Sequence, residues 1–263
     1  MELWQAVILG IVQGIAEFLP ISSSGHLVLL QQVFGIGPSM TFDIIVHIGS
    51  LCAVFAVFWK DILMLIKNPF QKMTAMLIVG TIPAVVVGFF LRDYMEVFHS
   101  GFLLAAAFIF TGVLLLIADS ITHTSKTEKE MGFADALIVG CMQAIALPPG
   151  ISRSGATITG GLVTGLTRET AARFSFLLSI IAILGAGALE AWEVLGSYEG
   201  VYRGDIPAFM VGFVMAAVSG YFSIRLLLEL IKKAKLKYFA YYVFVLAGFV
   251  LLDRFVLNIF FVS

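Results

Sequence analysis

The side chains best suited to chemistry lie close together near the start of the chain: Gln13, Glu17, the serines at 22–24, and His26. Gln13 and Glu17 are four residues apart, so they share one face of a helix. A carboxylate together with an amide oxygen suits a hard cation such as Mg²⁺ or Ca²⁺. Their neighbours are apolar, and an ionisable side chain in an apolar segment is by default a functional candidate. A proton carrier and a helix-end contact are the alternatives for Glu17.

The turn Ser22-Ser23-Ser24-Gly25 precedes a predicted helix. Hydroxyls and free N–H groups at a helix N-terminus form a binding site for anions. A single serine is enough to cap a helix. We assign that cap to Ser24, which leaves Ser22 and Ser23 as reactive or binding groups. His26 follows Ser23 by three residues and is placed to activate a hydroxyl nucleophile. The competing interpretation is a buried core histidine.

A second stretch repeats the first after an interval of 130 residues. Of the sixteen residues at positions 10–25, eight are identical to those at 140–155. The ionisable residues are not repeated, because Glu17 aligns with a leucine and Ser23 aligns with Arg153. An internal repeat of this kind indicates a symmetric scaffold. The asymmetry of its reactive groups predicts one composite site built from both copies.

The second copy contributes Ser152, Arg153, Ser154 and Gly155 at the start of another predicted helix. Arginine binds phosphate through two N–H groups and keeps its charge when buried. A second helix N-terminus directed at the same point adds to the positive field. Two helix N-termini, an arginine and a carboxylate-held cation describe a site for a polyanion. A diphosphate fits this site better than a single carboxylate does.

Asp43 and His47 form another pair four residues apart, at the start of a later apolar segment. The spacing places both on one helix face. They either line the pocket or only pair with each other.

The composition indicates a membrane protein that crosses the bilayer several times. Of 263 residues, 60% are hydrophobic and 13% are charged, and the mean hydropathy is +1.03. Soluble domains carry about 25% charged residues. The formal net charge of −1 gives no overall field that would attract nucleic acid. The bilayer is therefore the expected partner surface. The residues do not determine the oligomeric state, and a homodimer stays one open alternative.

The elements that must position these groups follow one plan twice. Each copy begins with two short apolar helices joined by a broken polar turn, and three longer apolar segments follow. The predicted helices are 3–18, 25–34, 41–59, 74–91 and 100–118 in the first repeat (residues 1–131), and 133–148, 155–165, 171–192, 207–231 and 238–259 in the second (residues 132–263). The short helices fall below the ~20 residues that a span needs, which favours re-entrant hairpins.

Because three spans is an odd number, the second repeat must enter the membrane inverted. We therefore expect an all-α polytopic membrane protein with a single membrane domain, an inverted repeat, six spans and four re-entrant half-helices, with its site near the bilayer midplane. The loops 60–73, 119–132, 166–173 and 232–237 hold eleven Lys and Arg, whereas the opposite side holds Arg92, Arg203 and Arg254. The positive-inside rule places those four loops in the cytoplasm, both termini outside, and the site open to the outer face.

Three motifs carry a resemblance to a known family. They are Gln13-x-x-x-Glu17, Pro20-x-Ser22-Ser23-Ser24-Gly25-His26 and Pro149-Gly150-x-Ser152-Arg153-Ser154-Gly155. Together they resemble the signatures of the bacterial undecaprenyl-diphosphate phosphatases, the bacitracin-resistance membrane phosphatases, and the likeness covers the whole chain. The resemblance implies hydrolysis of undecaprenyl diphosphate to undecaprenyl phosphate and inorganic phosphate, assisted by a divalent cation. It implies a bacterial inner-membrane protein that recycles the lipid carrier of peptidoglycan synthesis.

The resemblance also implies a role for each matching residue. Glu17 would hold the cation with help from Gln13, Ser23 would be the nucleophile, His26 the general base or acid, and Arg153 the phosphate clamp. The remaining motif residues would bind substrate: Ser22, Ser24, Gly25, Ser152, Ser154 and Gly155. Ser22 is a rival nucleophile, and a water activated by His26 is another. The runner-up function is a polyprenyl-phosphate transporter or flippase that uses the same midplane anion site but needs no nucleophile.

Overall fold

The computed structural model describes residues 1–91, 97–98, 100–196, 205–233 and 235–261, and in these ranges the chain is helical, without strands. The elements are α1 (Leu3–Phe18), α2 (Ser23–Val33), α3 (Met40–Val57), α4 (Trp59–Lys67), α5 (Lys72–Leu91), α6 (Gly101–Ser120), α7 (Phe133–Ile145), α8 (Arg153–Val163), α9 (Arg168–Gly196), α10 (Ile206–Lys233), α11 (Lys237–Leu252) and a closing π-turn, η3 (Asp253–Leu257). Arg92 and Arg203, two of the three cations assigned to the outer side, lie outside the described residues.

Six of these helices are long and apolar enough to cross a membrane: α3, α5, α6, α9, α10 and α11 with η3. They coincide with the six predicted spans to within a few residues, which confirms an all-helical, multi-pass protein. α1 and α7 are apolar but shorter, as predicted. The sequence reasoning missed α4, because its nine residues include Lys60, Asp61 and Lys67 and were assigned to a charged loop.

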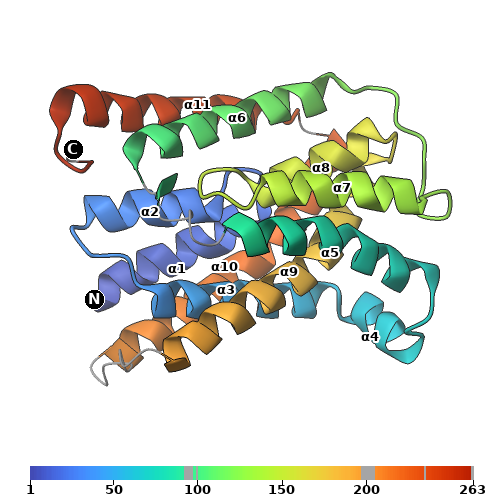
Figure 1. Cartoon of the computed structure of the whole chain (residues 1–263), viewed down its shortest axis with the longest axis horizontal. Helices are drawn as coiled ribbons and strands as arrows, with labels where there is room; N and C mark the ends of the chain where they lie inside the picture. The colour runs from blue at the N-terminus through green and yellow to red at the C-terminus, as the bar shows by residue number, and fades with distance from the viewer. Residues whose placement is uncertain (92–96, 99, 197–204, 234, 262–263) are drawn as a thin grey trace.

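The short helices lie between two outer groups of long ones (Figure 1). α6 and α11 run side by side along one edge of the molecule, and α3, α9 and α10 lie toward the opposite edge. α1 packs on α10, and α7 packs on α5. Both chain termini lie at one end of the molecule, while α4 and the connection from α6 to α7 lie at the other.

Glycines allow the short helices to approach their long partners closely. A Cβ added to Gly10 of α1 would lie 2.5 Å from the carbonyl oxygen of Gly212 in α10. A Cβ added to Gly140 of α7 would lie 2.3 Å from the carbonyl oxygen of Gly80 in α5. Any side chain would collide with backbone at both contacts. Small residues at such positions are how membrane helices reach close backbone packing.

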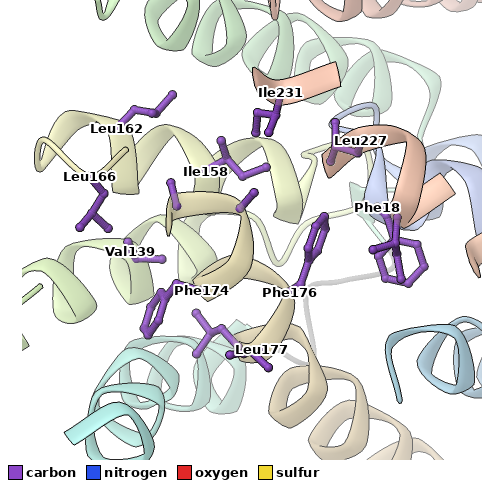
Figure 2. Close-up of a cluster of buried hydrophobic side chains, with 14 of the residues drawn as sticks. Phe18, Val139, Ile158, Leu162, Leu166, Phe174, Phe176, Leu177, Leu227 and Ile231 are labelled. Atoms are coloured by element: carbon purple, nitrogen blue, oxygen red, sulfur yellow. The ribbon is translucent and has the colours of Figure 1, made fainter. Parts of the chain in front are cut away.

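The end of α1 is anchored in the largest buried cluster (Figure 2). Phe18 is 1% exposed, and its ring meets that of Phe176 of α9 edge to face, with ring centroids 5.9 Å apart. Phe58 also packs on Phe176, at 5.7 Å. Aromatic pairs in this geometry add to the stabilisation from burial alone. Anchoring Phe18 fixes the direction of the preceding side chain, Glu17.

Candidate active site

The tips of the two helix pairs touch each other. The Ser154 hydroxyl donates to the carbonyl oxygen of Leu19, at 3.1 Å. Gly25 lies so close to the other tip that an added Cβ would be 2.9 Å from the Cα of Gly150. The N-termini of α2 and α8 therefore converge from the two copies of the repeat. Their free N–H groups face one shared region, as an anion site requires.

Both helices are capped at the same repeat position. The Ser22 hydroxyl oxygen accepts the N–H of Gly25 at 3.3 Å, and the Ser152 hydroxyl oxygen accepts the N–H of Gly155 at 3.1 Å. The assignment of the first cap to Ser24 was therefore wrong. Ser22 adopts a positive φ of 69°, a conformation that is uncommon for residues other than glycine and that a serine in the sequence does not predict. The Ser24 hydroxyl instead lies 3.4 Å from the Ser22 hydroxyl.

Glu17 lies at the centre of the site and binds side chains from several elements. Its Oε1 pairs with the Arg153 guanidinium, and its Oε2 accepts hydrogen bonds from the Ser23 hydroxyl and from Nε2 of Gln13, the latter at 3.1 Å. Nε2 of His47 lies 3.7 Å from the same Oε2. Only 7% of Glu17 is exposed, so these contacts take the place of water. The structure thus brings together the carboxylate, hydroxyl and guanidinium that the repeat comparison predicted to share one site.

These groups line a cavity of about 180 Å³. Its polar wall is formed by Glu17, Ser22, Ser23, Ser24, His47, Ser152 and Arg153. Its apolar wall comes from the end of α1, from α3 and α9, and from the second tip: Ala16, Ile44, Ile48, Ala146, Leu147, Ile151, Ala182, Ile183, Ala186 and Gly187. The charged part of this lining, here called the floor, together with the apolar part suits a ligand with a phosphate head and a hydrocarbon tail. Only the small residues of α9 could have indicated from the sequence that this helix lines the cavity.

His26 points elsewhere. Its Nδ1–H donates to the carbonyl oxygen of Ser22 at 2.6 Å, which leaves Nε2 to accept the Tyr242 hydroxyl at 2.8 Å. The two rings stack with centroids 5.6 Å apart. His26 is not among the residues that line the cavity, and both of its nitrogens are engaged away from Ser23. The predicted contact between His26 and the Ser23 hydroxyl is not formed in this structure.

Two residues that support the site were not predicted from the sequence. Tyr242 lies 216 positions from His26, and its hydroxyl fixes the histidine ring. Thr111 of α6 holds the second tip, because its hydroxyl donates to the Gly150 carbonyl at 3.0 Å and accepts the Ser152 N–H at 2.9 Å. Neither residue belongs to a motif, and no local pattern connects either of them to the tips.

The residues present fit a weakly held oxygen-binding cation. Oε1 of Gln13 is buried without a hydrogen-bond partner, beside the Glu17 carboxylate. Among the described residues no group of three or more His, Cys, Asp or Glu could hold a metal ion. Mg²⁺ is commonly bound by one or two carboxylates together with substrate phosphates and waters. Gln13 and Glu17 fit that pattern and do not form a complete cage.

Comparison with known proteins identifies the family of this chain. Residues 6–249 match the family model described as bacitracin resistance protein BacA. The chain is 45% identical over 248 residues to the undecaprenyl-diphosphatase of Carboxydothermus hydrogenoformans, covering 94% of this chain and 95% of the relative. It is 42% identical to the undecaprenyl-diphosphatase of Rubrobacter xylanophilus, with 95% and 97% of the two chains covered. Similarity of this extent over almost the whole chain, with both motif tips inside the matched range, shows that the chain belongs to the bacitracin resistance protein BacA family.

Proposed function

We propose that this protein is a membrane phosphatase that hydrolyses undecaprenyl diphosphate to undecaprenyl phosphate and inorganic phosphate. Relatives at 41–45% identity carry the name undecaprenyl-diphosphatase, and they match this chain over almost its full length. The observation that carries the proposal is the convergence of Glu17, Ser23 and Arg153, from two copies of one repeat, at the floor of one cavity. By this reaction the protein recycles the lipid carrier of peptidoglycan synthesis.

Ser23 is the proposed nucleophile. Its hydroxyl already donates to Glu17, so the carboxylate can take the proton as the Ser23 oxygen forms a bond to the terminal phosphorus. The bond between that phosphorus and the bridging oxygen then breaks, and undecaprenyl phosphate leaves with the bonding electrons. Water hydrolyses the phosphoserine in a second step. Arg153 stabilises the charge on the transferred group, since phosphoryl transfer depends mostly on positioning and charge stabilisation.

Substrate binding must rearrange the ion pair in the floor of the cavity. Arg153 binds Glu17 here, and its planar fork has further N–H donors that a phosphate can use. Ser22, Ser24 and Ser152 line the cavity and can bind the remaining phosphate oxygens. Gly25, Ser154 and Gly155, also predicted to bind substrate, do not line it and already use their N–H or hydroxyl groups in contacts within the tips. A base role for His26 requires its ring to exchange Tyr242 for the substrate or a water. Without that movement, His26 positions the carbonyl of Ser22 beside the nucleophile.

A divalent cation, Mg²⁺ or Ca²⁺, is part of the proposal. Glu17 and Gln13 would hold it, and it would supply positive charge to the phosphate oxygens. Gln13 is neutral, so this chain offers one carboxylate there. The unpartnered Oε1 of Gln13 supports a ligand at this point.

The packing supports the proposed inverted repeat of residues 1–131 and 132–263. By their order in the two repeats, α1 corresponds to α7, α3 to α9, α5 to α10 and α6 to α11. The contact of α1 with α10 therefore has an equivalent in the contact of α7 with α5, and both contacts are present in the fold. The contacts of α6 with α11 and of α3 with α9 each join two corresponding helices, so each is its own equivalent. A two-fold relation between the repeats accounts for these coincidences. In this arrangement α1 with α2, and α7 with α8, are re-entrant hairpins that meet near the midplane.

The orientation in the membrane follows from the same arrangement. The cavity is lined by Ile44, His47 and Ile48 in the first half of α3 and by residues 182–187 in the second half of α9. α3 begins and α9 ends at the end of the molecule where both termini lie (Figure 1). Together with the loop charges, this supports a bacterial cell-membrane protein with both termini outside and a cavity open to the outer face. The homodimer stays a prediction. The alternative function, a polyprenyl-phosphate flippase, draws support from the inverted repeat but gives the contact between Ser23 and Glu17 no purpose.

The test is phosphate release from undecaprenyl diphosphate by the purified protein in detergent, with and without EDTA. Ser23→Ala and Arg153→Ala should abolish release, and EDTA should suppress it in the wild type. His26→Ala separates a base role from a positioning role by the size of its effect. A well-folded wild type that releases no phosphate, but moves labelled polyprenyl phosphate across vesicles, would establish the flippase instead.

A further inference from the structure

One face of α3 carries polar side chains, and two of them lie next to Glu17 and Gln13. Asp43, His47 and Ser50 are spaced four and three residues apart, so they share one face of the helix. The Ser50 hydroxyl lies 3.5 Å from Nε2 of Gln13, and His47 lines the cavity beside Glu17. The motifs carried by α1, α2 and α8 do not include this helix. His47 is therefore a third contributor to a site so far described from two tips.

Hydrogen bonding fixes which nitrogen of His47 faces the cavity. Nδ1 lies 2.7 Å from the backbone carbonyl oxygen of Asp43, one turn earlier. A carbonyl can only accept, so Nδ1 carries the hydrogen. The lone pair of the neutral ring is then on Nε2, which is directed at Glu17. Histidines that bind metals characteristically donate their other N–H to a backbone carbonyl or a carboxylate in this way.

Nε2 of His47 and Oε2 of Glu17 are 3.7 Å apart, and when the imidazole ring is neutral both are acceptors. Two lone pairs that face each other repel unless a positive group lies between them. Ligand atoms about 2.1 Å from a shared metal lie roughly 3.0 Å apart in an octahedral site and roughly 3.4 Å apart in a tetrahedral one. The observed 3.7 Å exceeds the tetrahedral value by about 0.3 Å and the octahedral value by about 0.7 Å, so an octahedral ion would draw the two atoms together. Oε1 of Gln13 lacks a partner and belongs to the amide whose Nε2 binds Glu17, so turning that amide would add a third acceptor.

We propose that His47 is a nitrogen ligand of the divalent cation, completing with Glu17 and Gln13 a mixed nitrogen and oxygen site. This inference rests on the proposed function only for the presence of a cation. It adds a ligand from outside the motif residues, and it predicts a preference for ions that accept imidazole, such as Fe²⁺ and Ni²⁺, over Ca²⁺.

The charges indicate when this ion binds. Glu17 is the single carboxylate among the three ligands, and Arg153 already neutralises it. A divalent ion alone would leave the cavity with a net charge of about +2, which is costly in a poorly hydrated site. A phosphate offsets that charge and supplies further oxygen ligands. The ion and a phosphate should therefore bind together, each raising the affinity for the other by the same factor.

The experiment is electron paramagnetic resonance of Mn²⁺ added to the full-length protein in detergent, with and without inorganic phosphate. Wild-type protein should show hyperfine coupling of Mn²⁺ to an imidazole nitrogen, stronger in phosphate. His47→Gln and His47→Leu should both lose that coupling, and Mn²⁺ affinity should fall at least about tenfold in His47→Leu. His47→Gln should bind more tightly than His47→Leu, because its amide returns an oxygen ligand. His123→Gln, in the exposed loop after α6, is the matched control and should keep the coupling.

Two results would overturn the inference. One is bound Mn²⁺ without nitrogen coupling in the wild type, which would indicate an oxygen-only site at Glu17 with a proton between His47 and the carboxylate. The other is a nitrogen coupling that survives in His47→Leu. Phosphate release by the wild type is measured separately, so neither result depends on the proposed reaction. If the wild type releases phosphate but bound Mn²⁺ shows no nitrogen coupling, the proposed function stands and His47 is not a metal ligand.

Discussion

Glu17→Gln keeps the shape of the side chain and removes its charge, so it isolates what the carboxylate contributes. The carboxylate serves two sets of donors at once. Oε1 faces the Arg153 guanidinium, while Oε2 accepts from Ser23 and Gln13. A glutamine at this position has one acceptor oxygen and one amino group. Whichever way the amide is turned, one set of donors meets another donor.

The cost can be worked out for both orientations. If the amide oxygen faces Ser23 and Gln13, the charge-assisted bond to Arg153 is lost, at about 1.5–3 kcal/mol. If it faces Arg153, the two hydrogen bonds from Ser23 and Gln13 to the charged carboxylate are lost, at about 1.5–3 kcal/mol each. The first orientation costs less, so we expect a loss of about 1.5–3 kcal/mol. For a chain of this length that lowers the unfolding temperature by about 3–12 °C.

The assay is thermal unfolding in detergent followed by intrinsic tryptophan fluorescence, together with phosphate release. Glu130→Gln is the matched control, because this exposed carboxylate also accepts two hydrogen bonds, from the N–H and the hydroxyl of Thr127. Its free energy of unfolding should change by no more than about 0.5 kcal/mol. Glu17→Gln should also lower phosphate release by at least about 100-fold. An unfolding temperature within about 1 °C of wild type, with release within about tenfold, would refute the reasoning.

Three further substitutions probe other contacts by the same two assays. Ser22→Ala removes a helix cap and should cost about 1 kcal/mol, while lowering phosphate release only a few-fold; complete loss would make Ser22 the nucleophile instead. Tyr242→Phe leaves Nε2 of His26 without its donor and should cost about 1–3 kcal/mol, whereas an unchanged unfolding temperature would mean that water replaces the hydroxyl. Gly140→Ala places a Cβ against the Gly80 carbonyl and should cost about 1–3 kcal/mol by separating α5 from α7, so a neutral result would contradict the close packing.

The sequence was sufficient to locate the six helices that are long and apolar enough to span a membrane, because spans are set by length and hydropathy. The predicted segment 171–192 lies within α9, and 207–231 lies within α10. The short segments 3–18 and 133–148 also correspond to helices, α1 and α7. α4 failed the same criteria because its charged residues gave it the composition of a loop. Composition distinguishes segments that lie in the membrane from segments that lie in water. It does not distinguish a charged helix at the membrane surface from a charged loop.

The local geometry of the site was less predictable for a different reason. His26 was expected to contact the Ser23 hydroxyl because the two are three residues apart. Its actual partners are the backbone carbonyl of Ser22, four residues earlier, and the hydroxyl of Tyr242 in a distant helix. Spacing along a helix predicts which residues share a face. It does not predict which element will pack on that face.

Repeat symmetry was a better guide than residue type to which side chains meet, and the structure gives a physical reason. Where the two copies agree, the residues have the same structural role, since Ser22 and Ser152 cap their helices through equivalent hydrogen bonds. Where the copies differ, Ser23 and Arg153 occupy equivalent positions at the two helix starts, yet both bind one carboxylate, Glu17. Two identical tips would bring two hydroxyls or two guanidinium groups together. A nucleophile and a phosphate-binding cation can face each other across a two-fold scaffold only if the symmetry is broken at that pair of positions.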